Sequence, residues 1–358
     1  MTSAWGQDLN TTDHWADLIT KAQLGADLAA VGGLVLKDGE IIEQAFVGEK
    51  QKDSGLNIES DELWHIGSVT KSMTATMIAR LVEKDVLSWN DNIVDILGTK
   101  GIHRQWRDVT FHELLTHRSG AKPNFPILSN LFQPDTEEKT LAARKKQVRN
   151  VLKKKPRNEP GTTFQYSNVG FTIAAHLAEV KTGKSWETLM QEEVFEPLGL
   201  ASAGFGAPKS IDGEAVAWGH SGDRPTDPNG FADNSPVMGP SGNVHMTLHD
   251  LAKFGQAHMD GVRAQSDYLS QGSFEVLHTA QLEYYAMGWV ELSKSLFPDT
   301  KVFWHNGSNT FWYTLLLVLP EENMIYVLAT NSGKISAAES AFTDVMRAYA
   351  KSLKESAK

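Results

Sequence analysis

Apolar and β-branched residues gather in uninterrupted runs near both ends of the chain, and these runs predict β-strands. The strand-like runs lie at 30–37 and 40–47, within 303–312, and at 313–320 and 324–330. The first two are separated only by Asp38-Gly39, a pair typical of a two-residue hairpin turn. The pattern therefore predicts an N-terminal hairpin and a C-terminal meander of antiparallel strands.

Helical spacing of apolar positions dominates elsewhere. It predicts helices at about 12–22, 170–181 and 337–353, and a further helix after Ser68. Between 89 and 239 the pattern indicates helical pieces and long loops rich in Pro and Gly. We expect an α+β fold, an antiparallel β-sheet flanked by helices plus an all-helical region. Residues 1–88 and 240–358 would form the sheet region, and 89–239 the helical region.

The predicted helix after Ser68 begins with Ser68-Val-Thr-Lys71. Residues three apart share a helix face, so the hydroxyl and the amine would lie together near the positive end of the helix dipole. A partly desolvated lysine can lose its proton near neutral pH and act as a base toward the hydroxyl. The plain alternative is a capping serine with a solvated lysine.

Two similar patterns lack this context. Ser119-Gly-Ala-Lys122 has the same spacing, but Gly120 and Pro123 disfavour a helix there. The segment around Ser221 nearly matches the Gly-x-Ser-x-Gly elbow of another hydrolase fold, yet it lacks the last glycine and the strand-to-helix context. We therefore expect Ser221 to be a loop serine.

A second motif is Tyr166-Ser-Asn168, which follows a Pro-Gly turn and precedes a predicted helix. Beside a lysine ammonium the pKa of a tyrosine falls, so Tyr166 could take or relay a proton. The amide of Asn168 both donates and accepts, so it could orient the lysine and a substrate amide. The alternative is a turn tyrosine packed on the surface.

The third motif is His305-Asn-Gly307-Ser308, within the first predicted strand of the meander. Gly307 has no side chain, so a substrate backbone could lie against it. The backbone N–H groups of Ser308 and Ser68 would then face a bound carbonyl and form an oxyanion hole. The aromatic residues Trp304, Phe311 and Trp312 fit either an apolar substrate pocket or core packing.

Together the three motifs resemble those of the penicillin-recognising serine hydrolases, which include class C β-lactamases, low-molecular-weight penicillin-binding proteins, family VIII esterases and D-aminopeptidases. Further similar segments are 114–120, 159–161, 196–200, 239–243 and 285–289. The resemblance covers nearly the whole chain. It implies an active site in the cleft between the sheet and helical regions.

The resemblance also implies roles for the motif residues. Ser68 would attack a carbonyl carbon, and water would later release the acyl group. Lys71 and Tyr166 would share proton transfer, and the sequence leaves open which is the general base. Asn168 would orient Lys71 and the substrate. His305 would line the site and hydrogen-bond Tyr166 or the leaving group.

His305 departs from the Lys-Thr-Gly that β-lactamases and penicillin-binding proteins usually carry. A neutral histidine offers no fixed positive charge to a β-lactam carboxylate, so we expect at most weak β-lactamase activity. The expected substrates are carboxylic esters and D-amino-acid amides or peptides. A ligand-binding protein of the penicillin-binding type, or an acyltransferase with little hydrolysis, is the alternative.

Composition narrows the remaining possibilities. The chain has 358 residues, of which 41% are hydrophobic and 22% charged, as in globular proteins. No apolar run approaches the roughly 20 residues of a membrane span. With no signal peptide visible, we expect a cytoplasmic protein, or a periplasmic one if the sequence starts at a mature N-terminus. There are no cysteines, and the histidines show no metal-ligand spacing, so we expect no metal and no cofactor.

The formal net charge of −10 argues against nucleic-acid binding. Residues 139–157 are the exception, with many Lys and Arg and no acid. In this segment Leu141, Val148, Val151 and Leu152 fit one helix face, so its cations form either a solvated face or a face that binds an anion or a polymer. We expect a small-molecule substrate and a monomer or homodimer. Loops at about 121–135 and 205–236 are expected to set substrate choice.

Overall fold

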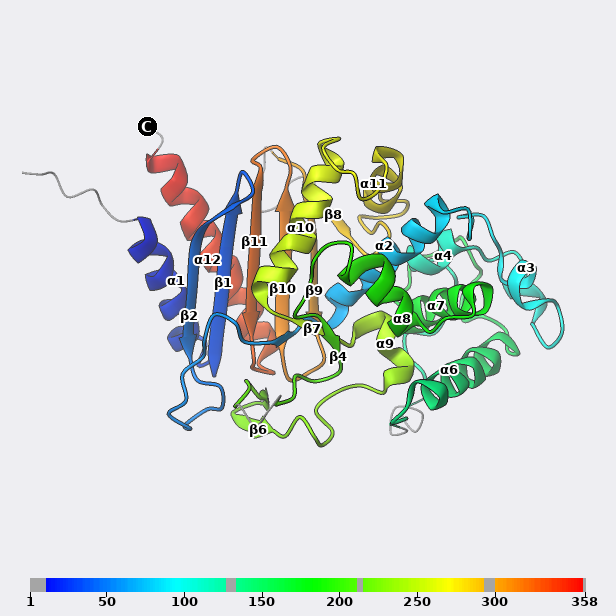
Figure 1. Cartoon of the computed structure of the whole chain (residues 1–358), viewed down its shortest axis with the longest axis horizontal. Coiled ribbons are helices and arrows are strands. Elements are labelled where there is room, and N and C mark those ends of the chain that lie inside the picture. The colour runs from blue at the N-terminus through cyan, green and yellow to red at the C-terminus, as the bar shows by residue number, and fades with distance from the viewer. Residues whose placement is uncertain (1–10, 127–132, 211–214, 293–299, 357–358) are drawn as a thin grey trace, which may run out of the picture.

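The computed structural model of the chain describes residues 11–126, 133–210, 215–292 and 300–356. The first residues, on which the leader prediction rests, and parts of the two predicted specificity loops (127–132 and 211–214) lie outside the described residues. The fold is α+β, as predicted, with an antiparallel sheet and helices on both of its faces (Figure 1).

The main sheet has six strands in the order β2-β1-β11-β10-β9-β8, and neighbouring strands are antiparallel. The strands are β1 Ala30–Lys37, β2 Glu40–Gly48, β8 Val290–Leu292, β9 Val302–Ser308, β10 Tyr313–Leu319 and β11 Met324–Thr330. Asp38 and Gly39 both have positive φ, as a type I′ hairpin turn requires. The predicted hairpin and meander are thus confirmed, and β1 joins them by pairing Val31 with Thr330 of β11.

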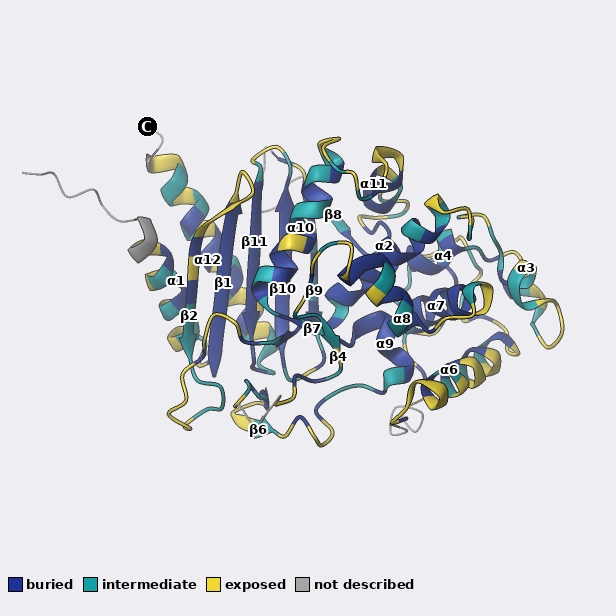
Figure 2. Ribbon diagram, viewed as in Figure 1, coloured by how far each residue is buried: buried dark blue, intermediate teal, exposed yellow. Residues whose placement is uncertain are grey.

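Both faces of this sheet are covered. Helices α1 (Thr11–Gly25) and α12 (Ile335–Ser356) pack on one face, and α10 (Leu248–Val262) packs on the other (Figure 1). Strands β10 and β11 are buried along their whole length, as Figure 2 shows. Burial on two faces explains why these strands appear in the sequence as continuous apolar runs without polar alternation.

The remaining helices form most of the other side of the molecule (Figure 1). They are α2 Thr70–Glu83, α3 Ile93–Leu97, α4 Phe111–Leu115, α6 Glu137–Leu152, α7 Asn168–Thr182, α8 Trp186–Met190, α9 Gly239–Gly242 and α11 Gln271–His278. Helix α7 begins where the Ser167 side chain accepts from the Gly170 N–H, and it ends at Gly183 in the left-handed conformation. The region boundaries near residues 88 and 240 stay a prediction.

Several short elements were not predicted, because two or three residues carry no readable periodicity. A small sheet joins β3 (Trp64–His65), β7 (Val244–Met246) and β4 (Gly204–Phe205), and β5 (Gly219–Ser221) pairs with β6 (Arg224–Thr226). Single turns are η1 Gly67–Val69, η2 Arg104–Trp106, η3 Gln191–Phe195 and η4 Pro236–Met238. No helix in the described ranges is long and apolar enough to cross a membrane.

Candidate active site

Ser68 lies on the 3-10 turn η1, directly before α2. Every residue from Trp64 to Ala79 is buried except Ser68, which is half-buried. The buried residues on both sides hold the backbone in place, and Ser68 carries the one accessible hydroxyl among them. The apolar spacing of α2 accounts for the burial of Met73, Met77 and Ile78, but not for the polar residues that are buried with them: Thr70, Lys71, Ser72, Thr74 and Thr76.

Lys71 is fully buried on the first turn of α2. Its Nζ lies 3.1 Å from Ser68 Oγ and donates a hydrogen bond of 2.6 Å to the backbone oxygen of Ser241 in α9. Burial lowers the pKa of Lys71 well below its ordinary value of 10.5. A neutral amine at this distance can accept the hydroxyl proton, as the sequence predicts.

Tyr166 meets Ser68 through a side-chain hydrogen bond, and the Lys71 Nζ lies 4.8 Å from the centre of its ring. The prediction that the pKa of Tyr166 falls is wrong. Burial raises it to about 12, and the hydrogen bond from Ser68 offsets this only in part. The lysine sits over the ring face and is itself driven toward the neutral form, so it does not stabilise a phenolate.

Asn168 opens helix α7 beside Tyr166, but its recorded partners differ from the prediction. Its Nδ2 donates to Asn124 Oδ1 at 2.7 Å, and its N–H donates to the Pro123 carbonyl oxygen. Among the described residues its Oδ1 has no hydrogen-bond partner although the atom is buried. The residue that holds Lys71 is Ser241, through its carbonyl oxygen, and not Asn168 as predicted. The amide of Asn168 thus has one free acceptor, and its donor is engaged with a loop.

Strand β9 and turn η1 touch through two glycines. A Cβ on Gly307 would collide with backbone atoms of Ile66 and Ser68, and one on Gly67 would collide with Ser308 N. Gly67 also has φ of +51°, a conformation that favours glycine. The open face of Gly307 is therefore filled by the turn that carries Ser68. This contact places the backbone N–H groups of Ser68 and Ser308 on adjoining segments.

His305 is buried in β9, and both of its ring nitrogens are engaged. Nε2 accepts from the Tyr285 hydroxyl at 3.0 Å, and Nδ1 donates to the Asn306 carbonyl oxygen at 2.5 Å. Burial, with the nearby Lys71, lowers the pKa of His305 to about 3, so the ring is neutral. The predicted hydrogen bond to Tyr166 is replaced by the one to Tyr285.

A network that the sequence analysis missed joins the two backbone segments. His65 Nδ1 accepts from the Gly67 N–H at 3.1 Å, so its Nε2 donates to Asp233 Oδ2 at 2.9 Å. The other oxygen of Asp233 accepts from Asn309 Nδ2 at 3.1 Å, and Asn309 lies just after β9. Asp233 therefore braces the η1 turn and the end of β9 together.

His117 was also missed. Its ring packs at a tilt against Tyr166 and Tyr285, with ring centres 4.3 and 4.5 Å away, and its Nδ1 accepts from the Ser167 N–H. The sequence could have pointed to three of the missed residues. His117, Ser241 and Tyr285 lie in segments 114–120, 239–243 and 285–289, respectively, and each of these segments is part of the family resemblance.

Ser119 and Lys122 lie in a loop, as predicted, and Gly120 between them has positive φ. The prediction that Ser221 is a loop serine is wrong, because Ser221 is the last residue of the short strand β5 and pairs with Arg224 of β6. No helix follows it, so the elbow context is missing as predicted. Trp304 packs with the core beneath α1 and α12, and Trp312 is buried against Ala207 and Ala232. Within the described ranges, no group of three or more His, Asp or Glu side chains is arranged to hold a metal ion.

Comparison with known proteins gives a consistent result. The family model described as Beta-lactamase matches residues 17–349. Penicillin-binding protein 4 of Amycolatopsis lactamdurans is 27% identical over 353 residues, which cover 93% of this chain and 88% of that protein. Unguisins hydrolase ungD' of Aspergillus campestris is 24% identical, over 77% of this chain and 54% of its own length.

Solved structures share the fold. D-amino acid amidase from Ochrobactrum anthropi SV3 aligns over 97% of this chain and 99% of its own, with a TM-score of 0.77 and 19% identity. The octameric penicillin-binding protein homologue from Pyrococcus abyssi aligns over 90% of this chain and 74% of its own, with a TM-score of 0.72 and 23% identity.

Proposed function

Because the chain belongs to the beta-lactamase family of serine hydrolases, we propose that it works through an acyl-enzyme formed on Ser68. The observation that carries this proposal is the buried Lys71 amine, 3.1 Å from the one accessible hydroxyl of its segment. Ser68 Oγ attacks a substrate carbonyl carbon, the leaving group departs, and water hydrolyses the resulting ester.

We assign the general base to Lys71. Its lowered pKa favours the neutral amine, which can take the Ser68 proton during attack. Tyr166, with a pKa raised to about 12, remains a phenol near neutral pH. A phenol can donate, so Tyr166 is suited to give its proton to the leaving group and to regain one from Lys71, which holds the proton taken from Ser68.

The oxyanion hole is assigned to the N–H groups of Ser68 and Ser308, supported by the close backbone contact of η1 with β9. Two such donors stabilise the charge that develops on the carbonyl oxygen. His305 would be a positioning residue, since both its nitrogens are already engaged. Asn168 remains proposed as the residue that orients the substrate, because its Oδ1 has no hydrogen-bond partner among the described residues.

The proposed substrates are carboxylic esters and D-amino-acid amides or peptides. The neutral His305 supports this choice, because it gives no fixed charge for a β-lactam carboxylate. The names of two fold relatives, a D-amino acid amidase and a D-stereospecific amidohydrolase, agree with the second class. Turnover of β-lactams should accordingly be weak.

The test is hydrolysis of p-nitrophenyl butyrate, a D-alanyl p-nitroanilide and nitrocefin by wild type and Ser68→Ala. We expect wild type to turn over the ester or the anilide faster than nitrocefin, and Ser68→Ala to lose nearly all activity. Ser221→Ala is the matched control and should keep wild-type rates.

Three outcomes would contradict the proposal. Activity retained in Ser68→Ala would show that the nucleophile is assigned wrongly. A single burst of product, with a stable acyl-protein seen by intact-mass spectrometry and no steady turnover, would favour a ligand-binding protein of the penicillin-binding type. Transfer of the acyl group to added amines or alcohols would identify an acyltransferase.

A further inference from the structure

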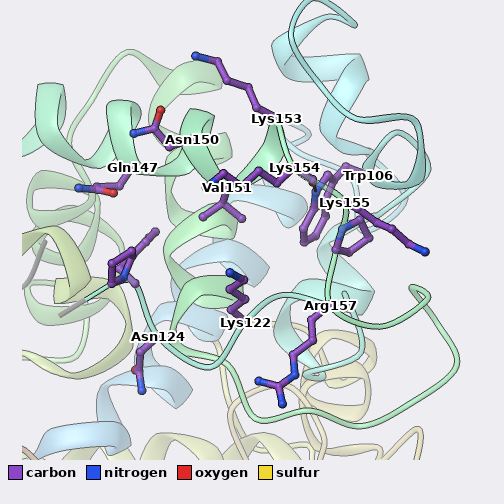
Figure 3. Close-up of a pocket in the computed structure, with 13 residues that line it drawn as sticks. Trp106, Lys122, Asn124, Gln147, Asn150, Val151, Lys153, Lys154, Lys155 and Arg157 are labelled. Atoms are coloured by element: carbon purple, nitrogen blue, oxygen red, sulfur yellow. Dashed lines mark hydrogen bonds between the residues drawn. The ribbon is translucent and has the colours of Figure 1, made fainter. Parts of the chain in front are cut away.

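A pocket of about 650 Å³ lies between the end of α6 and the loop that follows α4. Five basic residues line it, namely Lys122, Lys153, Lys154, Lys155 and Arg157. In Figure 3, Lys122 projects into the space between Val151 and Arg157, while Lys153 extends away from it. The lining includes no Asp or Glu, and Trp106 and Val151 add apolar wall.

These cations are unpaired within the described part of the chain, where no ion pair is formed by any of the five. All five side chains are exposed, so their charge is available to a ligand. The whole chain carries a net charge of −10, whereas the charged residues that line this pocket are all positive. A concave site lined by one sign of charge concentrates ions of the opposite sign.

The backbone that carries the basic side chains is held in place. The Trp106 indole donates to the Lys154 carbonyl oxygen at 2.8 Å, and the Arg157 N–H donates to the Gly120 carbonyl oxygen at 2.8 Å. The backbone on both sides of the pocket is therefore held in place.

The pocket adjoins the candidate active site. Asn124, which lines the pocket, accepts the hydrogen bond from Asn168 Nδ2, and the Lys122 carbonyl oxygen accepts from the Ser167 hydroxyl at 2.6 Å. The loop that carries Lys122 and Asn124 is therefore shared between the pocket and the Tyr166-Ser-Asn168 motif. Ser68 itself does not line the pocket, so the two sites are neighbours.

We propose that this basic pocket binds an anionic group, a carboxylate or a phosphate, at the far end of the substrate that acylates Ser68. The inference rests on the proposed function and deepens it by naming the substrate class. Lys122 and Arg157 would donate charge-assisted hydrogen bonds to the anion, and Val151 would pack against the apolar chain that links it to the reacting carbonyl.

The first experiment measures binding without catalysis. Citrate and tripolyphosphate are titrated into wild type at low salt by calorimetry, and the two probes distinguish carboxylates from phosphates. The double variant Lys122→Gln/Arg157→Gln should weaken binding of the preferred probe about tenfold or more. Lys145→Gln/Lys146→Gln changes the charge equally, on exposed α6 positions outside the pocket, and should bind as wild type does.

The second experiment measures substrate choice. A series of p-nitrophenyl monoesters of dicarboxylic acids, with increasing chain length, is compared with the corresponding methyl diesters. We expect the ratio of kcat/KM for acid over methyl ester to peak at one chain length in wild type. That peak should fall about tenfold in Lys122→Gln/Arg157→Gln and persist in Lys145→Gln/Lys146→Gln. A matching phosphate-tailed ester tests the phosphate arm.

The outcomes separate the two proposals. If neutral esters are hydrolysed but no acid or phosphate tail is preferred at any length, the pocket proposal is overturned while the proposed function stands. Absence of citrate and tripolyphosphate binding, or equal binding by both double variants, overturns it as well. If wild type is inert on every ester and on the D-alanyl p-nitroanilide, the proposed function fails, and the titrations still decide whether the pocket takes anions.

Discussion

Lys71 and Tyr166 are both buried beside Ser68, and burial shifts their pKa values in opposite directions, down for the amine and up for the phenol. The sequence identifies both residues through their motifs. It predicts the shift of Lys71 correctly and that of Tyr166 wrongly, because the direction depends on which atoms cover the phenol. The same limit applies to His305, whose partner Tyr285 is 20 residues away in the chain.

Removing the Lys71 amine should inactivate the enzyme and change the pH dependence of its stability. Between the folded pKa of Lys71 and its unfolded value of 10.5, the unfolded chain binds one proton more. Stability of wild type therefore rises with pH across that interval, by about 1.4 kcal/mol per pH unit. We expect Lys71→Met to lack this slope, so that its stability relative to wild type declines as pH rises toward 10.

The measurement is urea unfolding of both proteins at several pH values from 7 to 10. A stability difference that stays constant with pH would mean that Lys71 is protonated in the folded protein. In that case it could not serve as the base toward Ser68.

At the scale of secondary-structure elements, the close contact between β9 and η1 brings the backbone of Ser308 beside that of Ser68. The long apolar strands were predicted because burial on both faces leaves a strong pattern, whereas β3, β4 and β7 are too short to leave one. Gly307 was predicted in the correct strand but with the wrong neighbour. Its missing side chain makes room for the Ser68 turn, and a contact between segments 240 residues apart has no local sequence signal.

Substituting Gly307 should therefore damage catalysis more than folding. A Cβ there would push β9 away from η1 and separate the two proposed oxyanion donors. We expect Gly307→Ala to lower kcat about 100-fold, the scale of losing one such donor. Gly272→Ala, on helix α11 with no crowded neighbour, is the control and should keep the wild-type kcat.

Rates are measured with the best substrate found for wild type, and folding is checked by circular dichroism and urea midpoint. A Gly307→Ala protein that is folded and fully active would contradict the placement of the oxyanion hole at this contact.

At the scale of the whole molecule, a buried ion-pair network links α6 to the neighbouring helices α7 and α8. The buried stripe of α6 is Thr140, Arg144, Val148 and Leu152, and Arg144 is fully covered. Its guanidinium pairs with Glu179 of α7 and Glu187 of α8. The apolar spacing in the sequence predicted that Val148 and Leu152 lie on one face. It did not predict that Arg144 is buried, because Arg144 lies among other basic residues that are exposed.

Removing this buried cation should destabilise the fold. Arg144→Met would leave Glu179 buried without its main counter-charge, and breaking a buried pair in this way costs about 3–5 kcal/mol of unfolding free energy. Arg144→Met/Glu179→Leu should recover a large part of that loss, because no buried charge is then left unpaired. Urea unfolding of the two variants and wild type measures the effect, and equal stability of Arg144→Met and wild type would contradict it.

The pairing of β1 with β11 also bears on how the chain is made. Val31 lies opposite Thr330, so the N-terminal hairpin cannot find its permanent neighbour until 299 further residues have been added. At about 5–20 residues per second, a ribosome needs roughly 15–60 s for that stretch. Throughout this interval the apolar edge of β1 has no partner strand. Nascent chains of this protein should therefore depend on chaperones that shield such edges, and stalled or truncated products should be prone to aggregate.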